Sequence, residues 1–231
     1  MTWADRLSLF TVLDFVALGL ALTVWLGLSW CIEHSGARPS TSQLMADYRR
    51  AWMVQMVTRN PRIFDAQVIG NMRQGTAFFA STAVLAIGGT LALIGNAEAL
   101  TDIASELLLI ADPAFVWELK LVTVALFLTN AFLKFVWSNR LFGYASVLMG
   151  AVPNDPNDPL AYPRAAQAAE VNVTAARAFN RGLRAVYFAL TSAVWLAGPI
   201  PFLAATAFTS GVIIRREFAS QSRLILLENR P

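Results

Sequence analysis

Charged residues and metal-binding side chains are scarce in this chain. Asp, Glu, Lys and Arg make up only 14% of its 231 residues, whereas soluble globular domains contain roughly 25%. Cys31 is the only cysteine and His34 is the only histidine. An intrachain disulfide is therefore excluded, and so is a haem held between two histidines of this chain.

Recognisable catalytic motifs are also missing. The sequence has no HExxH pair, no glycine-rich phosphate loop and no Ser/His/Asp set. The acidic residues are not clustered with Cys31 or His34 as a zinc site would require. No soluble module with a basic face is present, which argues against nucleic-acid binding. We therefore expect a protein that is not an enzyme and has no catalytic residues, no metal and no cofactor.

Long apolar runs, by contrast, are abundant. Hydrophobic residues make up 56% of the chain, and four runs are nearly free of charge. A helix of about 20 residues crosses the ~30 Å hydrocarbon core of a bilayer, and a helix satisfies its own backbone polar groups in lipid. The sequence therefore predicts an all-α integral membrane bundle of four transmembrane helices. It forms a single polytopic domain over residues 1–231, with spans at about 9–30, 76–94, 114–137 and 185–214.

The basic residues predict the side of the membrane on which each connection lies. Residues 96–113 contain no Lys or Arg and four acidic residues, whereas the first and third connections are rich in arginine. Positive residues concentrate in cytoplasmic loops. This alternation places both arginine-rich connections in the cytoplasm and the N-terminus in the periplasm of a bacterial inner membrane. The arginines are Arg38, Arg49, Arg50, Arg59, Arg62 and Arg73 in the first connection, and Arg140, Arg164, Arg177, Arg181 and Arg184 in the third.

The last apolar run allows two paths. Residues 185–214 would measure about 45 Å as one helix, and Gly198-Pro199-Ile200-Pro201 interrupts them. Proline removes a backbone donor and kinks or breaks a helix. We favour a single kinked and tilted crossing, which leaves the basic tail outside. The alternative is a hairpin of two half-spans, which returns the tail to the cytoplasm.

Two amphipathic helices are predicted at the cytoplasmic surface. One begins near Gln43 behind a cap at Thr41 or Ser42, and the other begins after Pro163 and leads into the last span. Pro61 is suited to start a third helix that continues through the second span. The apolar stripe of the first helix packs either into the membrane interface or onto the protein's own spans. That stripe consists of Met45, Tyr48, Trp52 and Met56.

Polar residues at membrane depth are few. Asp14 and Lys120 lie at similar depth in the first and third spans, which run in the same direction. Because charges are costly in a bilayer, we predict an intramembrane ion pair between them. A proton or cation pathway through Asp14 and Glu118 is the alternative. In the second span, Gly88-Gly89 favours close helix packing over local unwinding for transport.

Several strings resemble one known family. The sequence resembles the bacterial members of the domain-of-unknown-function family 599, which are predicted multi-pass membrane proteins. The resemblance covers nearly the whole chain and implies a fold and a membrane location, but no activity. It is carried by Arg50-Ala51-Trp52-Met53, Phe78-Phe79-Ala80-Ser81-Thr82, Lys134-Phe135-Val136-Trp137-Ser138-Asn139-Arg140, Phe179-Asn180-Arg181-Gly182-Leu183-Arg184, Tyr187-Phe188-Ala189-Leu190 and Arg215-Arg216-Glu217-Phe218.

These strings lie near the predicted cytoplasmic ends of the spans. Arginine donors and aromatic walls suit an anionic lipid headgroup or metabolite, so we predict one cytoplasmic pocket for such a ligand. The candidate binding residues are Arg50, Lys134, Arg140, Asn180, Arg181 and Arg184.

Two functions are compatible with these features. We favour an accessory or scaffolding component that associates with a larger membrane complex or with itself. The alternative is a small oligomeric transporter or channel for an anionic or lipid-like solute. A polar cavity lined by Asn130, Lys134, Asn180 and Arg181 would favour transport. The expected partners are the bilayer, anionic lipid and a membrane protein.

Overall fold

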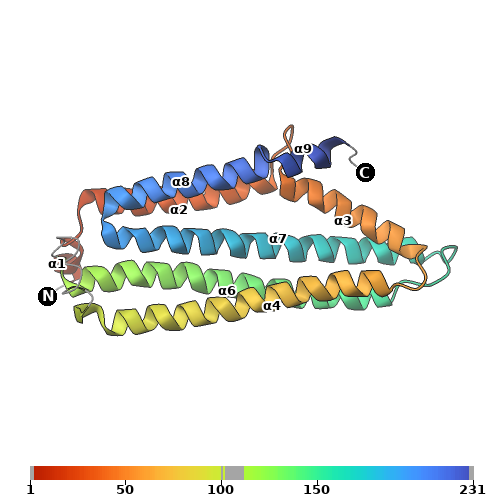
Figure 1. The fold of residues 1–231 in the computed structure, drawn as a ribbon, viewed down its shortest axis with the longest axis horizontal. Helices are drawn as coiled ribbons and strands as arrows, with labels where there is room; N and C mark the ends of the chain where they lie inside the picture. Colours follow the sequence, from red (N-terminus) through yellow and green to blue (C-terminus); the bar gives the residue numbers. More distant parts are fainter. Residues whose placement is uncertain (1–2, 100, 102–111, 229–231) are drawn as a thin grey trace. The chain divides into compact units, whose positions relative to one another are not determined.

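The computed structural model describes residues 3–99, 101 and 112–228. Within these residues the chain is helical and contains no strand, which confirms the all-α fold class. The helices are drawn in Figure 1. Their bounds are α1 Trp3–Leu7, α2 Val12–Glu33, α3 Thr41–Val57, α4 Ile63–Gly95, α6 Ala114–Gly150, α7 Ala161–Ala193, the 3-10 helix η1 Val194–Ala197, α8 Pro199–Phe218 and α9 Gln221–Glu228.

Among the described residues, three helices are long and apolar enough to cross a membrane, namely α2, α4 and α6. They correspond to the first three predicted spans, although α2 begins at Val12 rather than at residue 9, and α4 and α6 are longer than predicted. The fourth predicted span, 185–214, is not among them. The helix α4 begins at Ile63, directly after Pro61-Arg62, as the sequence predicted. The helix α6 continues past Trp137 to Gly150 because Phe142, Ala145 and Met149 keep a buried helical face after the uncharged run has ended.

The chain divides into two compact units. Unit 1 consists of Met1–Ser29, Thr82–Ala131 and Leu183–Ile213. Unit 2 consists of Trp30–Ser81, Phe132–Gly182 and Ile214–Pro231, and therefore contains the first connection, the third connection up to Gly182, and the tail.

The core of unit 1 combines small and aromatic side chains. Ala17 and Ala21, one helical turn apart on α2, are fully buried, so that neighbouring helices approach this face closely. Phe127 of α6 lies between two aromatic partners, with ring centroids 5.1 Å from Trp25 and 6.1 Å from Phe188. A second cluster consists of Phe10, Ala17, Ala21, Val116, Trp195 and Phe202.

The chain reverses direction between α7 and α8, within unit 1. The hydroxyl oxygens of Thr191 and Thr209 lie 2.7 Å apart, and the rings of Trp195 and Phe202 stack with centroids 5.2 Å apart. On one straight helix, Thr191 and Thr209 would be about 27 Å apart. The predicted single kinked crossing of residues 185–214 is therefore wrong. The chain reverses here, as the hairpin alternative required, but α8 has 20 residues and is longer than a half-span (Figure 1).

Gly198 makes this reversal possible. Its φ of 107° and ψ of 168° belong to a region that is essentially restricted to glycine. The residue after it, Pro199, opens α8, where a missing N–H costs nothing and the fixed φ of proline suits a first helical turn. The same Gly-Pro string is compatible with a kink, which is why the sequence left the two paths open.

We expect Gly198→Ala to destabilise the hairpin by about 1–3 kcal/mol, because a Cβ strains this backbone conformation. Gly211→Ala in α8 is the matched control, since nothing lies within 4 Å of the position of its added Cβ. It should be neutral or slightly stabilising. Thermal unfolding in detergent measures both changes, and equal unfolding temperatures for the two variants would refute this role of Gly198.

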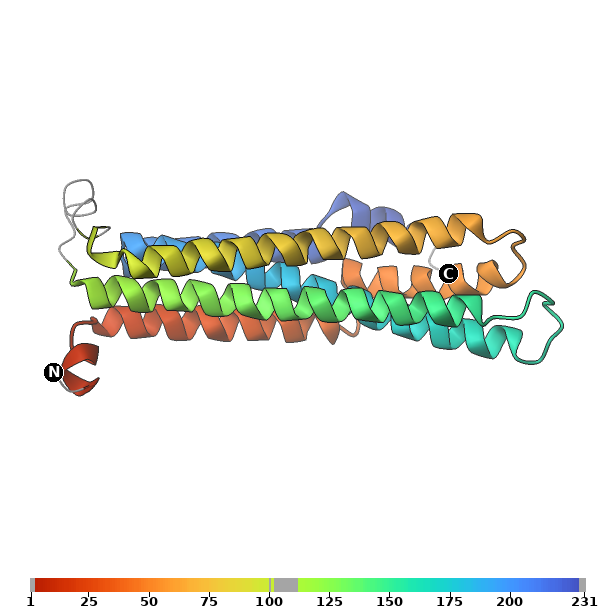
Figure 2. The ribbon, with the colours of Figure 1, turned by 90° about the horizontal axis from the view of Figure 1, so that it is seen from below.

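The core of unit 2 is built from methionine, alanine and aromatic residues. Helices α4 and α6 run side by side in opposite directions (Figure 2). Their contact includes Phe79 and Phe135, whose ring centroids are 5.5 Å apart. Phe179 of α7 lies 5.4 Å from Phe79 and 5.5 Å from Phe135. Three of the strings that carried the family resemblance therefore meet in one aromatic cluster.

The helix α3 is capped one residue earlier than the sequence indicated. Ser40, not Thr41 or Ser42, is the N-cap, and Gln43 completes a capping box with it. On the predicted apolar stripe, Met56 is buried and Trp52 packs against the core of unit 2, whereas Met45 is exposed. The stripe thus packs partly on the protein itself. Helix α9 in turn packs on α3.

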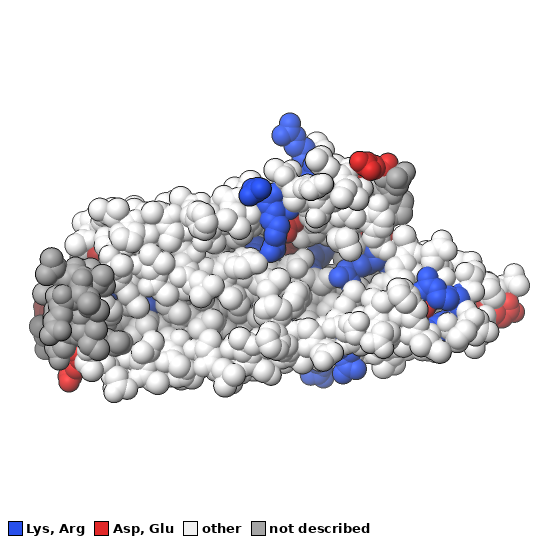
Figure 3. Space-filling model, in the orientation of Figure 1, with Lys and Arg blue, Asp and Glu red and all other residues white. Residues whose placement is uncertain are grey.

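The two units differ in charge. Of the 18 Lys and Arg residues in the sequence, unit 2 has 15, together with 8 of the 15 acidic residues, for a formal charge of +7. Unit 1 has three basic and seven acidic residues, for a formal charge of −4. Figure 3 shows basic side chains gathered over the segments of unit 2 on one face, beside extensive uncharged surface.

Candidate functional site

A polar network in unit 2 joins the start of α3 to the end of α8. Glu217 of α8 is buried, and its carboxylate accepts hydrogen bonds from the backbone N–H of Ser42 at 3.0 Å and from the Ser42 hydroxyl at 3.1 Å. A carboxylate at the first turn of a helix also interacts favourably with the helix dipole. The Thr41 hydroxyl donates to the backbone oxygen of Glu217 at 3.1 Å.

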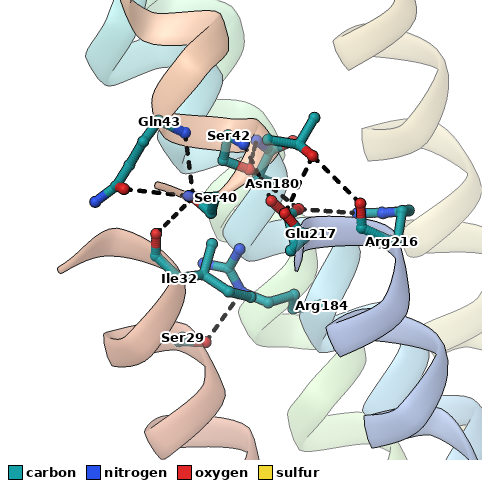
Figure 4. A network of polar contacts seen from close by, with 10 residues as sticks. Ser29, Ile32, Ser40, Ser42, Gln43, Asn180, Arg184, Arg216 and Glu217 are labelled. Carbon is teal, nitrogen blue, oxygen red and sulfur yellow. Dashed lines mark hydrogen bonds and ion pairs between the residues drawn. The ribbon is translucent and has the colours of Figure 1, made fainter. Parts of the chain in front are cut away.

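Asn180 extends this network to α7. Its Nδ2 donates to the Ser42 hydroxyl oxygen at 3.3 Å (Figure 4). On the side of α2, the Ser40 hydroxyl donates to the backbone oxygen of Ile32 at 2.8 Å. The network therefore holds segments of α2, α3, α7 and α8 together within unit 2, and its partners are all supplied by the chain.

Two of the predicted anion-binding arginines have carboxylate partners. Arg181 forms a two-pronged pair with Glu33, in which Nε donates to Oε1 at 2.8 Å. Arg50 binds Glu170 through Nε at 2.6 Å and Nη2 at 3.1 Å, and also contacts Asp47. The hydrogen bond from Arg50 lowers the pKa of Glu170 from its usual value. A ligand anion would have to compete with these carboxylates.

The other predicted binding residues are dispersed. Arg140 donates to the hydroxyl of Tyr144 and lies over its ring. Lys134 is half-buried on α6. Arg184 belongs to unit 1, where it is buried and its Nε donates to the Ser29 hydroxyl at 3.0 Å (Figure 4). The structure places these residues in separate contacts, and anion binding by the set stays a prediction.

The predicted ion pair between Asp14 and Lys120 is not formed directly. Lys120 is buried in unit 1, and its Nζ lies 3.0 Å from Oδ2 of Asp112. Asp14 instead accepts hydrogen bonds from Trp195 Nε1 at 2.7 Å and from the Thr11 hydroxyl at 2.6 Å. An electrostatic attraction between Asp14 and Lys120 remains. Asp112 precedes α6 and lies outside the apolar runs, so a pairing based on charges within the spans does not include it.

Asp65 is a buried hydrogen-bond acceptor that the sequence did not indicate. It is 1% exposed, and its Oδ1 accepts hydrogen bonds from Trp52 Nε1 at 2.6 Å and from Arg59. Trp52 and Arg59 precede Pro61, where one helix ends and the next begins, whereas Asp65 follows it. Helical periodicity does not extend across this boundary and therefore could not reveal the contact. These two hydrogen bonds hold the turn between α3 and α4 in place.

Arg49 is a second site residue that the sequence missed. It lies on α3 and donates through Nη1 to Asn172 Oδ1 at 2.5 Å and to the sulfur of Met72. Burial lowers the pKa of Arg49 to about 10 because desolvation disfavours the charged form. Since Asn172 is fully buried, this hydrogen bond holds α3 against α7 in unit 2. Only knowledge of the α3–α7 contact would have identified the pair.

The described residues contain no group of three or more His, Cys, Asp or Glu side chains that could hold a metal ion. Several polar contacts of unit 2, such as those of Glu217 with Ser42 and of Arg181 with Glu33, join different helices.

Together, the three long apolar helices, the α7–α8 hairpin and the basic unit 2 define an all-α protein with the features of a multi-pass membrane protein. The chain matches the family described as "Protein of unknown function, DUF599" over residues 16–222 and belongs to that family. No curated protein and no solved structure matches the chain.

Proposed function

We propose that this chain is a non-catalytic accessory component that docks onto a larger membrane assembly through helix α4. The observation that carries the proposal is the low burial of α4. Only 11% of its most apolar 18 residues are buried by this chain, against 17% for α2 and 39% for α6. Much of α4 therefore faces surroundings outside the described chain.

One face of α4 is suited to close packing. Gly88, Ala92 and Gly95 follow at intervals of four and three residues and are exposed. Nothing lies within 4 Å of a Cβ added at Gly88 or Gly95. Small side chains at this spacing let two helix backbones approach each other in a membrane. The occupant that fits is a transmembrane helix of a partner protein that also presents small side chains.

Two observations favour this role over transport. The helix α4 is continuous through Gly88 and Gly89, without the local unwinding that a pathway would use. Asn180 and Arg181, which would line a polar path, are engaged by Ser42 and Glu33. Both observations support packing as the role of this region.

We further propose the orientation in a bacterial inner membrane. The formal charge of +7 on unit 2 supports a cytoplasmic location for both long connections and the tail. The α7–α8 hairpin removes the conflict that a single crossing created, because it returns Arg215 and Arg216 to the side of the other arginines. The N-terminus then lies in the periplasm, and anionic lipid is the expected partner of the exposed arginines.

Co-purification from native membranes tests the docking role. The wild-type chain and two variants, Gly88→Leu and Ala86→Leu, are isolated in mild detergent and the recovered membrane proteins are quantified by mass spectrometry. Ala86 is exposed on the opposite face of α4 and serves as the matched control. We expect Gly88→Leu to reduce recovery of a specific membrane partner about tenfold. Unchanged recovery, or an equal loss with Ala86→Leu, would contradict the proposal.

A further inference from the structure

A pocket in unit 2 is separate from the polar network at α3 and α8. It has a volume of about 440 Å³ and is lined by the start of α4, the last turns of α6, the end of α3 and the connection after α6. Its polar wall includes Arg62, Asp65 and Arg73, and its apolar wall includes Met56, Ile69 and Met149. None of these residues was predicted as a ligand site.

The two arginines of this pocket have no carboxylate partner in the described part of the chain. Arg62 donates through Nη1 to the backbone oxygen of Val152 at 2.7 Å, and through Nη2 to that of Pro153 at 2.7 Å. Its Nε is buried and has no acceptor among the described residues. A buried donor without an acceptor is costly, so an additional acceptor at this wall would stabilise the site.

The local charge balance favours an anion. Arg59 forms an ion pair with Oδ1 of Asp65, whose Oδ2 is buried and has no donor among the described residues. Arg59, Arg62 and Arg73 together against Asp65 leave an excess of two positive charges. A phosphate monoester carries about −1.5 to −2 charges at neutral pH. The guanidinium fork is also the side chain best matched to phosphate oxygens.

We propose that this pocket binds the phosphoryl group of an amphipathic phosphate compound. Arg62, through its Nε, and Arg73 contact the phosphate oxygens, and the amide of Asn154 supplies a further donor at the pocket wall. Met56, Ile69 and Met149 accommodate the apolar part of the same molecule. The phosphoryl group belongs either to an anionic lipid or to a soluble organic phosphate, and both present the same chemistry to the arginines.

Binding measurements on the purified full-length protein separate these two sources. The protein is placed in phosphatidylcholine nanodiscs with or without phosphatidic acid, and phenyl phosphate, a soluble monoester with an apolar group, is titrated into the discs that lack phosphatidic acid. Binding of phenyl phosphate supports a soluble ligand. Retention of phosphatidic acid in native mass spectrometry, without phenyl phosphate binding, supports a lipid. Failure to bind either probe overturns the proposal.

Two pocket variants and one control locate the site. Arg73→Gln removes an exposed cation, and we expect about tenfold weaker binding of the effective probe. Gly70→Leu leaves every charge in place but fills open space at the pocket wall, because nothing lies within 4 Å of its added Cβ. It should also weaken binding about tenfold. Arg177→Gln, an exposed arginine of α7 outside the pocket, should have no effect. Equal affinities for all four proteins, or a loss with Arg177→Gln as large as with Arg73→Gln, overturn the proposal.

Discussion

Replacement of Gly182 by alanine is expected to lower the free energy of unfolding by about 2 kcal/mol. Gly182 of α7 is buried, and an added Cβ would lie 2.6 Å from Cε1 and 2.9 Å from Cδ1 of Phe135. Alanine normally stabilises a helix interior by about 1 kcal/mol relative to glycine. Overpacking of a tight core costs about 1–3 kcal/mol and sometimes more. We expect the cost of the clash to exceed the gain in helix propensity, because the Phe135 ring is fully buried between Phe79 and Phe179 and cannot move away.

A double-mutant cycle separates this clash from other effects of the substitution. Phe135→Leu creates room next to Gly182, so the two substitutions together should cost at least about 1 kcal/mol less than the sum of the single changes. Gly75→Ala in α4 is the control, since nothing surrounds its added Cβ, and it should be neutral or stabilising. Thermal or chemical denaturation in detergent gives these values. Additive costs for Gly182→Ala and Phe135→Leu would show that the close contact is not the cause.

Asp112→Ala should destabilise unit 1 by about 3 kcal/mol. Lys120 is 2% exposed, and its Nζ has Asp112 as its ion-pair partner at 3.0 Å. Removing one member of a buried pair leaves the other charge without compensation, which costs about 3–5 kcal/mol. We expect a cost at the lower end of this range, because the Asp112 side chain is itself partly exposed. The unfolding temperature in detergent reports the loss.

The companion variants decide which acid pairs with Lys120. Lys120→Met in the Asp112→Ala background removes the uncompensated charge and should restore most of the lost stability. The carboxylate of Asp14 accepts hydrogen bonds from Trp195 and Thr11. Because Asn has nearly the same shape as Asp, Asp14→Asn should lower the free energy of unfolding by only about 1 kcal/mol. A larger loss for Asp14→Asn than for Asp112→Ala, with no rescue by Lys120→Met, would instead favour the direct Asp14–Lys120 pair.

Much of the helical framework could be predicted from the sequence. Length and hydropathy located α2, α4 and α6, and Pro61 marked the start of α4, because an uncharged run and a proline act locally on the backbone. The path after Ala193 could not be decided in the same way. Gly198-Pro199 is compatible with a kink or a reversal, and the contacts that distinguish them, such as Thr191 with Thr209, are made only after folding.

For the candidate sites, too, the sequence indicated local features but not contacts between distant helices. The sequence correctly indicated that arginines concentrate near the ends of apolar runs. It could not show that Arg50 and Arg181 have partners on other helices, Glu170 and Glu33, which are distant in the chain. The pocket at Arg62 and Arg73 was missed for a related reason. Its walls come from segments that are far apart in the sequence, such as Arg62 directly before α4 and Met149 in α6, and arginine spacing alone does not reveal a cavity.

The family strings have a structural explanation. Phe79, Phe135 and Phe179 come from three of these strings and pack together, and Gly182 leaves the space that the Phe135 ring occupies. Ser138, from the same string as Phe135, donates to the backbone oxygen of Ala175 at 2.8 Å. These residues therefore hold α4, α6 and α7 together in unit 2, and the strings mark a packing core.

Labelling of single cysteines with a membrane-impermeant maleimide tests the central claim, an integral membrane bundle whose hairpin returns the tail to the side of the arginine-rich connections. Ser8→Cys, Asp155→Cys and Ser222→Cys, all at exposed positions, are introduced separately into a Cys31→Ser chain. In intact cells we expect labelling at residue 8 only, and at residues 155 and 222 after permeabilisation. Labelling of residue 222 together with residue 8 in intact cells, or recovery of the chain outside the membrane fraction, would contradict the account.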